Sequence, residues 1–190
     1  MIHDIDYVLI SENEIDQIVS RIAADIDRDY ENSDKKLLLL CILKGSVVFM
    51  GDLMKKIERP VEIDFMKVSS YGAGTSTSGR VSIMLDLYRN DLADVDIIIV
   101  EDIIDSGKTL SYLCEYLKLK GANSVRTCTM LDKPSRRQVD FTADYVGREI
   151  PDAFVVGYAG KVECCFTCLI GYLYASPREW LINAVYSISY

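Results

Sequence analysis

The spacing of isoleucine and valine near the N-terminus predicts the first helix of the chain. Ser11-Glu12-Asn13-Glu14 has the form of a capping box, in which a serine and the glutamate three residues later satisfy each other's free backbone groups. Ile10 and Ile15 stand where the hydrophobic staple of such a box packs. From Ile15 to about Tyr30 the apolar residues recur every three or four positions, which predicts an amphipathic helix with one buried face.

Apolar runs that alternate with helix-like stretches make up most of the remaining chain. Leu37–Leu43 is continuously apolar, which is typical of a strand covered on both faces. A helix is predicted from Val47 to about Ile57, and another, marked by apolar positions from Leu110 to Leu117, is closed by Gly121 as its C-cap. Further strand-like segments lie at 60–70, 80–85, 96–100, 125–131 and 153–156. This alternation predicts an α/β fold, with a mostly parallel twisted sheet flanked by helices, in a single domain over residues 1–190.

The segment 69–79 is rich in glycine, serine and threonine, and it is too polar to belong to the core. It has two interpretations, the tip of a hairpin or a mobile lid. Long loops without secondary structure in compact domains are commonly functional, which favours the lid.

Composition and charge narrow the class of protein. Hydrophobic residues make up 49% of the 190 residues and charged residues 26%, which is a globular composition. No stretch is apolar for the roughly 18 residues of a membrane helix, and the first residues are acidic where a targeting peptide would be basic. We therefore expect a soluble cytoplasmic protein. The net charge of −8 argues against general binding to nucleic acid or to anionic membranes.

The cysteine and histidine content argues against two kinds of site. Cys164-Cys165-x-x-Cys168 has a spacing that zinc could use, but the sequence holds no second pair of ligands, so buried or incidental thiols are the favoured interpretation. His3 is the only histidine, which removes catalytic triads that depend on histidine.

The stretch 96-DIIIVEDIIDSGKTL-110 concentrates candidate chemistry at the end of a predicted strand. In open parallel sheets ligands bind beyond the carboxyl ends of the strands, where Glu101, Asp102 and Asp105 would lie. The hydroxyls and glycine of Ser106-Gly107-Lys108-Thr109 then open the next helix, which suits a phosphate group. Acids beside such a cradle suit sugar hydroxyls, a divalent cation or a proton to be removed. The segment therefore predicts a ligand with a phosphate at one end and hydroxyls in its middle.

Two other interpretations of this stretch are weaker. A P-loop needs glycine five residues before the Gly107-Lys108-Thr109 triplet, and Asp102 occupies that position. A solvated acidic loop followed by an N-cap serine would explain the hydroxyls but not the concentration of carboxylates beside them.

Val100-Glu-Asp-Ile-Ile-Asp-Ser-Gly-Lys-Thr109 resembles the phosphoribosyl-pyrophosphate (PRPP) motif of type I phosphoribosyltransferases, and more narrowly that of the hypoxanthine-guanine phosphoribosyltransferases. The likeness covers about residues 5–159. It also extends, in order, through the segments 43–46, 61–66, 69–72, 131–134, 144–147, 149–152 and 154–158. The resemblance implies the type I fold with a small hood over the active site. It also implies purine salvage, in which hypoxanthine or guanine and PRPP give the nucleoside monophosphate and pyrophosphate.

The resemblance also implies a role for each matching residue. The PRPP and phosphate site would consist of Lys44, Gly45, Ser70, Tyr71, Glu101, Asp102, Asp105, Ser106, Gly107, Lys108 and Thr109. Within it, Glu101 and Asp102 would hold the ribose hydroxyls and Mg²⁺, directly or through water. Lys44-Gly45 matches a pyrophosphate loop of unusual backbone conformation, and Ser70-Tyr71 matches the tip of the lid.

On the purine side, Asp105 would accept the proton from N7 as the catalytic residue. Lys133 would donate to the 6-oxo group, Phe154 would stack on the base, and Val155 would supply backbone contacts. Mg²⁺ and Lys44 would neutralise the leaving pyrophosphate, and a lid would exclude water from an oxocarbenium-like transition state. The competing interpretations are a solvated Lys133 and a Phe154 that is plain core.

The likeness stops near residue 159, and 160–190 is an atypical tail. Relatives continue after Gly-Tyr with a Leu-Asp-Tyr-like element, whose Asp supports magnesium. They then carry Lys-Tyr-Arg-x-Leu-Pro-Tyr, whose Arg contacts pyrophosphate. Neither residue is in register in 157-GYAGKVECCFTC-168. Translation out of frame after Lys161 and divergence of a poorly constrained tail both explain this, and the other reading frames of the gene decide between them. Either predicts weaker binding of metal and pyrophosphate.

Two functional alternatives remain on the same fold. One is a regulatory nucleotide-binding or RNA-binding protein, which would want a basic face and is disfavoured by the net charge. The other is a catalytically impaired subunit, suggested by the tail. A dimer or tetramer is expected only from the resemblance, and the preference among hypoxanthine, guanine and xanthine is not legible in the sequence.

Overall fold

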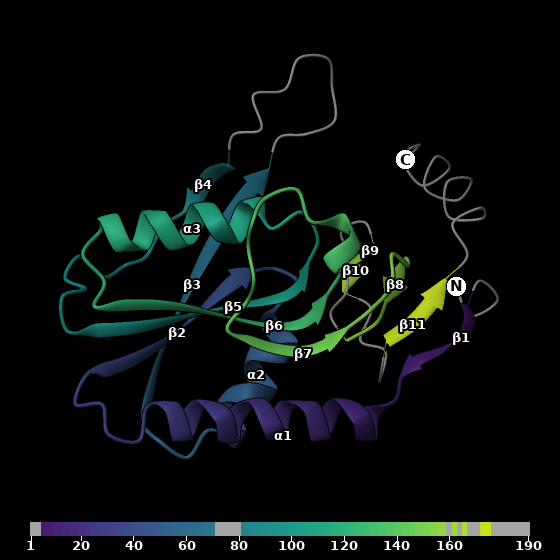
Figure 1. The fold of residues 1–190 in the computed structure, drawn as a ribbon, viewed down its shortest axis with the longest axis horizontal. Coiled ribbons are helices and arrows are strands. Elements are labelled where there is room, and N and C mark those ends of the chain that lie inside the picture. The colour runs from purple at the N-terminus through teal and green to yellow at the C-terminus, as the bar shows by residue number, and fades with distance from the viewer. Residues whose placement is uncertain (1–4, 71–80, 159–160, 163–164, 167–171, 176–190) are drawn as a thin grey trace.

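The computed structural model describes residues 5–70, 81–158, 161–162, 165–166 and 172–175 (Figure 1). Its main sheet has six strands in the order β4-β3-β2-β5-β6-β7. The strands β2 (Lys36–Leu43), β3 (Val61–Ser70), β5 (Val95–Ile104), β6 (Ser124–Asp132) and β7 (Tyr145–Glu149) pair in parallel, and β4 (Val81–Leu85) is antiparallel to β3. The predicted α/β fold with a mostly parallel sheet is confirmed.

Helices cover both faces of this sheet. α1 (Glu12–Asp29) and α2 (Val47–Lys56) lie on one face, and α3 (Lys108–Leu119) lies on the other (Figure 1). Because successive side chains of a strand point to opposite faces, β2 serves two cores. Leu37, Leu39 and Cys41 pack with the α1 and α2 side, whereas alternate residues such as Leu38 and Leu40 pack with α3. A strand that is buried on both faces needs the continuous apolar run that the sequence shows.

Both helix ends that the sequence marked are close to their predicted places. The Ser11 backbone N–H donates to Glu14 Oε2 at 2.9 Å and the Glu14 N–H to Ser11 Oγ at 3.4 Å, so the capping box is formed. Ile10 and Ile15 are both buried beside it. At the C-terminus of α3 the C-cap is Lys120, one position before the predicted Gly121, which follows it with φ of +92°.

β5 is longer than predicted. The apolar run suggested 96–100, but pairing with β6 continues beyond it through Glu101↔Thr129 to Ile104↔Asp132. Pairing with β2 on the other side ends at Cys41↔Val100. Glu101 and Asp102 therefore lie on β5 itself, in the part of the strand that pairs with β6 but no longer with β2.

A second, smaller sheet was only partly anticipated. β1 (Ile5–Ile10), β11 (Tyr172–Ala175) and β8 (Val155–Val156) form it in the order β1-β11-β8, and β9 (Lys161–Val162) pairs with β10 (Cys165–Phe166). The strand predicted at 153–156 is thus shorter and belongs to this small sheet. It lies beyond the carboxyl ends of β6 and β7, where a small hood was expected (Figure 1). The sequence analysis missed β1 and β7, which are short, and the strands β9, β10 and β11 of the tail.

Several expectations fall outside the described residues. The segment 71–80 joins β3 to its antiparallel neighbour β4, but the lid itself, with Tyr71, lies outside the description. So do Cys164, Cys168 and most of the atypical tail. No helix in the described part of the chain is long and apolar enough to cross a membrane.

Candidate active site

The candidate site lies between β2 and β5, where the order in which the chain adds strands to the sheet reverses. From β2 the chain passes through α2 to β3 on one side, and from β5 it passes through α3 to β6 on the other. α2 and α3 lie on opposite faces, so the loops after β2 and β5 diverge and leave a crevice between them. Both loops carry residues that the sequence analysis selected, which explains how positions about 60 residues apart in the chain come together.

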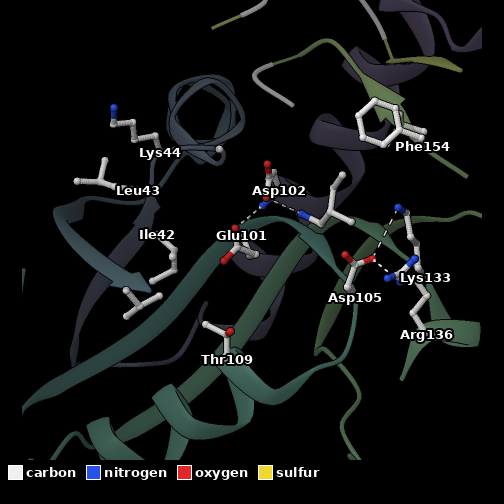
Figure 2. A pocket seen from close by; sticks show the side chains of 14 residues that line it. Ile42, Leu43, Lys44, Glu101, Asp102, Asp105, Thr109, Lys133, Arg136 and Phe154 are labelled. Atoms are coloured by element: carbon white, nitrogen blue, oxygen red, sulfur yellow. Dashed lines mark hydrogen bonds and ion pairs between the residues drawn. The ribbon is translucent and has the colours of Figure 1, made fainter. Parts of the chain in front are cut away.

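A cavity of about 610 Å³ occupies this crevice. Its walls come from the loop after β2, the end of β5 with the turn into α3, the turn after β6 and the start of the small sheet (Figure 2). The predicted site residues that line it are Lys44, Gly45, Glu101, Asp102, Asp105, Thr109, Lys133, Phe154 and Val155. The structure therefore brings members of each predicted set (phosphate, ribose and purine) to one cavity, whereas Ser106, Gly107 and Lys108 are not among the residues that line it.

Glu101 and Asp102 form a pair of acids on the inner wall. Burial raises the pKa of Glu101 well above its usual range, and repulsion by Asp102 raises it further. Burial also raises the pKa of Asp102, although the Ile103 N–H, which donates to Asp102 Oδ1 at 2.8 Å, opposes this. Among the described residues, no lysine or arginine forms an ion pair with either carboxylate. A cation bound at this pair would stabilise the charged forms that burial disfavours.

The loop after β2 packs directly against this pair. The peptide bond between Leu43 and Lys44 is cis. A Cβ added to Gly45 would lie 2.0 Å from Asp102 Oδ2, so any side chain there would have to displace the Asp102 carboxylate or the loop itself. The absence of a side chain at residue 45 thus allows the Asp102 carboxylate to lie against the loop.

The turn into α3 forms the opposite wall. Gly107 is the N-cap of α3 with φ of +79°, a conformation that favours glycine. Thr109 lines the cavity in the first turn of the helix, and Lys108 beside it is exposed. The N-terminus of a helix presents free backbone N–H groups, so this turn can hold an anion.

Asp105 lines the cavity beside two cations, Lys133 and Arg136 (Figure 2). Its Oδ1 is 3.7 Å from Lys133 Nζ and 3.7 Å from Arg136 Nε. The Asp105 side chain is 53% exposed, whereas that of Lys133 is only 9% exposed, so the lysine is held and the acid is reachable. The solvated interpretation of Lys133 is therefore wrong. Its backbone N–H donates to the Ile104 carbonyl at 3.0 Å, which anchors the turn after β6 to β5.

Phe154 and Val155 close the cavity from the small sheet. Phe154 is 41% exposed and points toward the cavity (Figure 2), which does not match a plain core residue. Val155 is buried. Ser70 ends β3, but its side chain lies outside the described residues, as does Tyr71.

The sequence analysis missed Arg136 and Arg137. Arg136 lines the cavity and bridges Asp105 to Asp152, with its Nη1 3.0 Å from Asp152 Oδ1. Arg137 lies behind the turn into α3 and donates from Nη1 to the Asp105 carbonyl at 2.6 Å. The signal for both was available: two adjacent arginines follow Lys133 closely, just after a strand that ends at the ligand side of the sheet.

Comparisons with known proteins identify relatives over most of the chain. The family described as "Phosphoribosyl transferase domain" matches residues 11–162. The chain is 51% identical over 158 residues to the hypoxanthine-guanine phosphoribosyltransferase of Bacillus subtilis, a match that covers 83% of this chain and 86% of the relative. It is 47% identical over 151 residues to the hypoxanthine phosphoribosyltransferase of Salmonella typhimurium, covering 80% and 84%.

Solved structures agree with these relatives. The crystal structure of a hypoxanthine phosphoribosyltransferase from Staphylococcus aureus matches with a TM-score of 0.86 at 41% identity, covering 93% of this chain and 95% of that one. The type I fold that the sequence motifs implied is therefore confirmed.

Proposed function

The chain belongs to the phosphoribosyltransferase family, and from this premise we propose that it is a purine salvage enzyme. It joins hypoxanthine or guanine to the ribose 5-phosphate of PRPP and releases pyrophosphate, giving inosine or guanosine monophosphate. The named relatives are transferases of this kind, which does not favour the regulatory or RNA-binding alternative.

The placement of Asp105 beside Lys133 is the observation that carries the choice of base. A 6-oxopurine presents its carbonyl oxygen next to N7, which carries a proton before the reaction. Lys133 can donate to the oxygen while Asp105 accepts from N7–H, since Lys133 Nζ and Asp105 Oδ1 are 3.7 Å apart. Adenine has an amino group at the same position, so a lysine donor would face another donor. Phe154 offers a face for stacking on the base.

PRPP fits the remainder of the cavity by its charges. The 5′-phosphate would be held by the N–H groups and hydroxyls from Asp105 to Thr109, and the ribose hydroxyls by Glu101 and Asp102. The pyrophosphate would lie at Lys44 and Gly45, where the lysine neutralises part of its charge. Ser70 and Tyr71 remain proposed contacts at the lid.

The acid pair also suits Mg²⁺. Magnesium is commonly held by one or two carboxylates, with water and substrate oxygens completing its coordination. Glu101 and Asp102 supply such a pair, and no larger cluster of metal-binding side chains is found among the described residues. When bound, Mg²⁺ would neutralise charge on the diphosphate.

Different side chains then assist different steps of the reaction, in which the purine displaces pyrophosphate. The purine nitrogen N9 forms a bond to the anomeric carbon, and the bond from that carbon to the pyrophosphate oxygen breaks. Asp105 takes the proton from N7 as this occurs, and the cavity orients the reacting atoms. The exposed position of Asp105 leaves it reachable by a base that enters from solvent.

Inosine monophosphate formation from hypoxanthine and PRPP tests this proposal. The wild-type protein should be active only with Mg²⁺ and should use adenine poorly. Asp105→Asn keeps the shape of the side chain but removes its basicity, so the rate should fall by about a hundredfold. Equal rates for the two proteins would remove the assignment of Asp105, and no turnover by the wild-type protein would contradict the proposed function.

A further inference from the structure

We propose that Arg137 is a positioning residue for the 5′-phosphate, although it lies outside the set of residues that line the cavity. Its guanidinium fixes the turn 105–107 so that two consecutive backbone N–H groups face the phosphate. This inference rests on the proposed function, because it concerns the phosphate end of the same site.

Arg137 joins three segments of the chain. Its Nη1 donates to the Asp105 carbonyl at 2.6 Å and its Nε to the Phe141 carbonyl at 3.0 Å. Its Nη2 forms an ion pair with Asp132 at the end of β6. The Arg137 side chain is 15% exposed and that of Asp132 6%, so the fork is held in a largely buried setting. Each of the three guanidinium nitrogens thus contacts a different acceptor, and the planar geometry of the group allows the three contacts to form together.

A second contact follows directly in the sequence. The backbone N–H of Gln138 donates to the Ser106 carbonyl at 3.0 Å. Two consecutive carbonyls of the turn, those of Asp105 and Ser106, are thus held by two consecutive residues, Arg137 and Gln138. The turn cannot rotate either peptide plane without breaking one of these bonds.

Because peptide bonds are planar, holding these two carbonyls also fixes the directions of the N–H groups that follow them. In a trans peptide the C=O and the following N–H point in opposite directions. Because the Asp105 carbonyl faces Arg137, the Ser106 N–H faces away from it, and the Gly107 N–H likewise faces away from Gln138. Neither N–H donates to an acceptor within the part of the chain that the structure describes. Both are therefore available to an anion at the start of α3.

The same segment leaves the turn little room to move. A Cβ added to Gly107 would lie 2.9 Å from Arg137 Cδ and 3.2 Å from both Val139 Cγ2 and Phe141 Cβ. The turn is thus packed against 137–141 by van der Waals contact as well as by hydrogen bonds. Since the Arg137 charge is already paired with Asp132, its contribution to phosphate binding is geometric and not a direct charge contact.

Arg137→Lys separates geometry from charge. Lysine can keep the ion pair with Asp132 but cannot also reach the Asp105 and Phe141 carbonyls with a fixed fork. Arg148→Lys is the matched control: within the described part of the chain, the one ion pair of Arg148 is an exposed contact with Glu14 at 3.0 Å, away from the cavity. For each protein the dissociation constants of guanosine monophosphate and guanosine would be measured by calorimetry, together with the KM for PRPP and for hypoxanthine.

The difference between the nucleotide and the nucleoside isolates the phosphate. In Arg137→Lys the affinity for guanosine monophosphate and the KM for PRPP should each worsen by about tenfold, the effect of one hydrogen bond to a charged group. Guanosine affinity and the KM for hypoxanthine should change by less than about twofold, and Arg148→Lys should match the wild-type protein. Equal losses for nucleotide and nucleoside would indicate a general structural role and overturn the proposal, as would no loss at all.

A measurement on the wild-type protein covers the case in which the variant does not fold. With ¹⁵N labelling, the amide signals of Ser106 and Gly107 should shift when guanosine monophosphate is added and should stay in place with guanosine. Signals that respond to neither ligand overturn the proposal. Turnover of hypoxanthine by the same sample tests the proposed function separately, so the two failures are distinguishable.

Discussion

The Asp102 carboxylate lies against the backbone of Gly45, with its Oδ2 2.0 Å from the position that a Cβ on residue 45 would take. This contact joins the loop after β2 to the acid pair at the end of β5. The proposed pyrophosphate and ribose contacts are therefore one packed unit, and a change at Gly45 must move Asp102 or its own loop.

Gly45→Ala should weaken PRPP binding for this reason. The added methyl group displaces the Asp102 carboxylate or the Lys44 backbone, and a shift of about 1 Å at such a site is enough to cost about a hundredfold in rate. We expect kcat/KM for PRPP to fall by about that factor while the free energy of unfolding changes little. Steady-state kinetics and urea unfolding measure the two quantities.

Gly51→Ala is the matched control for this substitution. Gly51 lies within α2, and a Cβ added there meets no atom within 4 Å. Alanine is the better helix former by about 1 kcal/mol, so this variant should be slightly more stable and fully active. Full activity in Gly45→Ala would show that the close contact is unimportant for the reaction.

Lys133→Met should affect the base and spare PRPP. The substitution keeps much of the side-chain volume but removes the ammonium group that lies 3.7 Å from Asp105 Oδ1. Loss of a hydrogen bond from a charged donor should raise the KM for hypoxanthine by about tenfold or more, and the preference over adenine should narrow. The KM for PRPP should stay within about twofold, because the lysine lies on the purine side.

Lys118→Met controls for the loss of one positive charge. Lys118 is exposed on α3 and lies outside the cavity, so its removal should leave both Michaelis constants unchanged. If Lys133→Met raised only the KM for PRPP, the assignment of the purine and phosphate ends of the cavity would have to be reversed.

The sequence predicted the frame of the fold because its signals are local. A continuous apolar run and a capping box each fix an element from a few neighbouring residues, as β2 and α1 demonstrate. β7 was missed because Tyr145–Glu149 is short and polar in part, and its identity as a strand depends on pairing with β6. The three-stranded β1-β11-β8 sheet joins segments from opposite ends of the chain, which no local pattern announces.

The site was predicted from motifs, and its supporting contacts were not. The acids from Glu101 to Asp105 stand where a parallel sheet places ligands, so they could be selected from the sequence. The roles of Arg136 and Arg137 depend on distances to Asp105 that only the folded chain supplies. The bound Mg²⁺, the lid at Tyr71, the expected homo-oligomer and the origin of the tail stay predictions.

Glu101→Gln should stabilise the free protein and weaken the enzyme. Two adjacent, partly buried carboxylates repel each other, and burial disfavours their charged forms. The amide removes one charge at nearly constant shape, so the free energy of unfolding without ligand should rise by an amount on the order of 1 kcal/mol. The Mg²⁺ concentration needed for half-maximal activity should rise at the same time.

Glu115→Gln serves as the control for Glu101→Gln. Glu115 is exposed on α3, and its substitution should alter neither stability nor the response to Mg²⁺. A Glu101→Gln protein that unfolds more easily than the wild-type protein, with no ligand present, would contradict this account of the acid pair.

Asp96→Asn should reveal a carboxylate at the other end of β5 that supports the fold without touching the site. Asp96 is 5% exposed and accepts hydrogen bonds from Ser124 Oγ at 2.5 Å, Asn123 Nδ2 at 2.7 Å and Ser33 Oγ at 3.1 Å. Burial alone would raise the pKa of Asp96, but these donors outweigh it and lower the pKa below the usual value of 3.8. An asparagine turns a donor toward at least one of these donors, which should cost about 2 kcal/mol at neutral pH.

The pH dependence of this cost has a definite sign. Because the pKa of Asp96 is lower in the folded state, the unfolded state binds more protons in the interval between the two values, and stability rises with pH there. The contribution of Asp96 is therefore complete above the unfolded value, near 3.8, and is lost as the pH falls through the folded value. Urea unfolding of wild-type and Asp96→Asn proteins should show a constant difference from neutral pH down to about pH 5, and the difference should shrink below about pH 4. As a control, Asp140→Asn, at an exposed position, should unfold like the wild-type protein at every pH. A stability difference for Asp96→Asn that grows as the solution becomes more acidic would contradict a lowered pKa for Asp96 in the folded state.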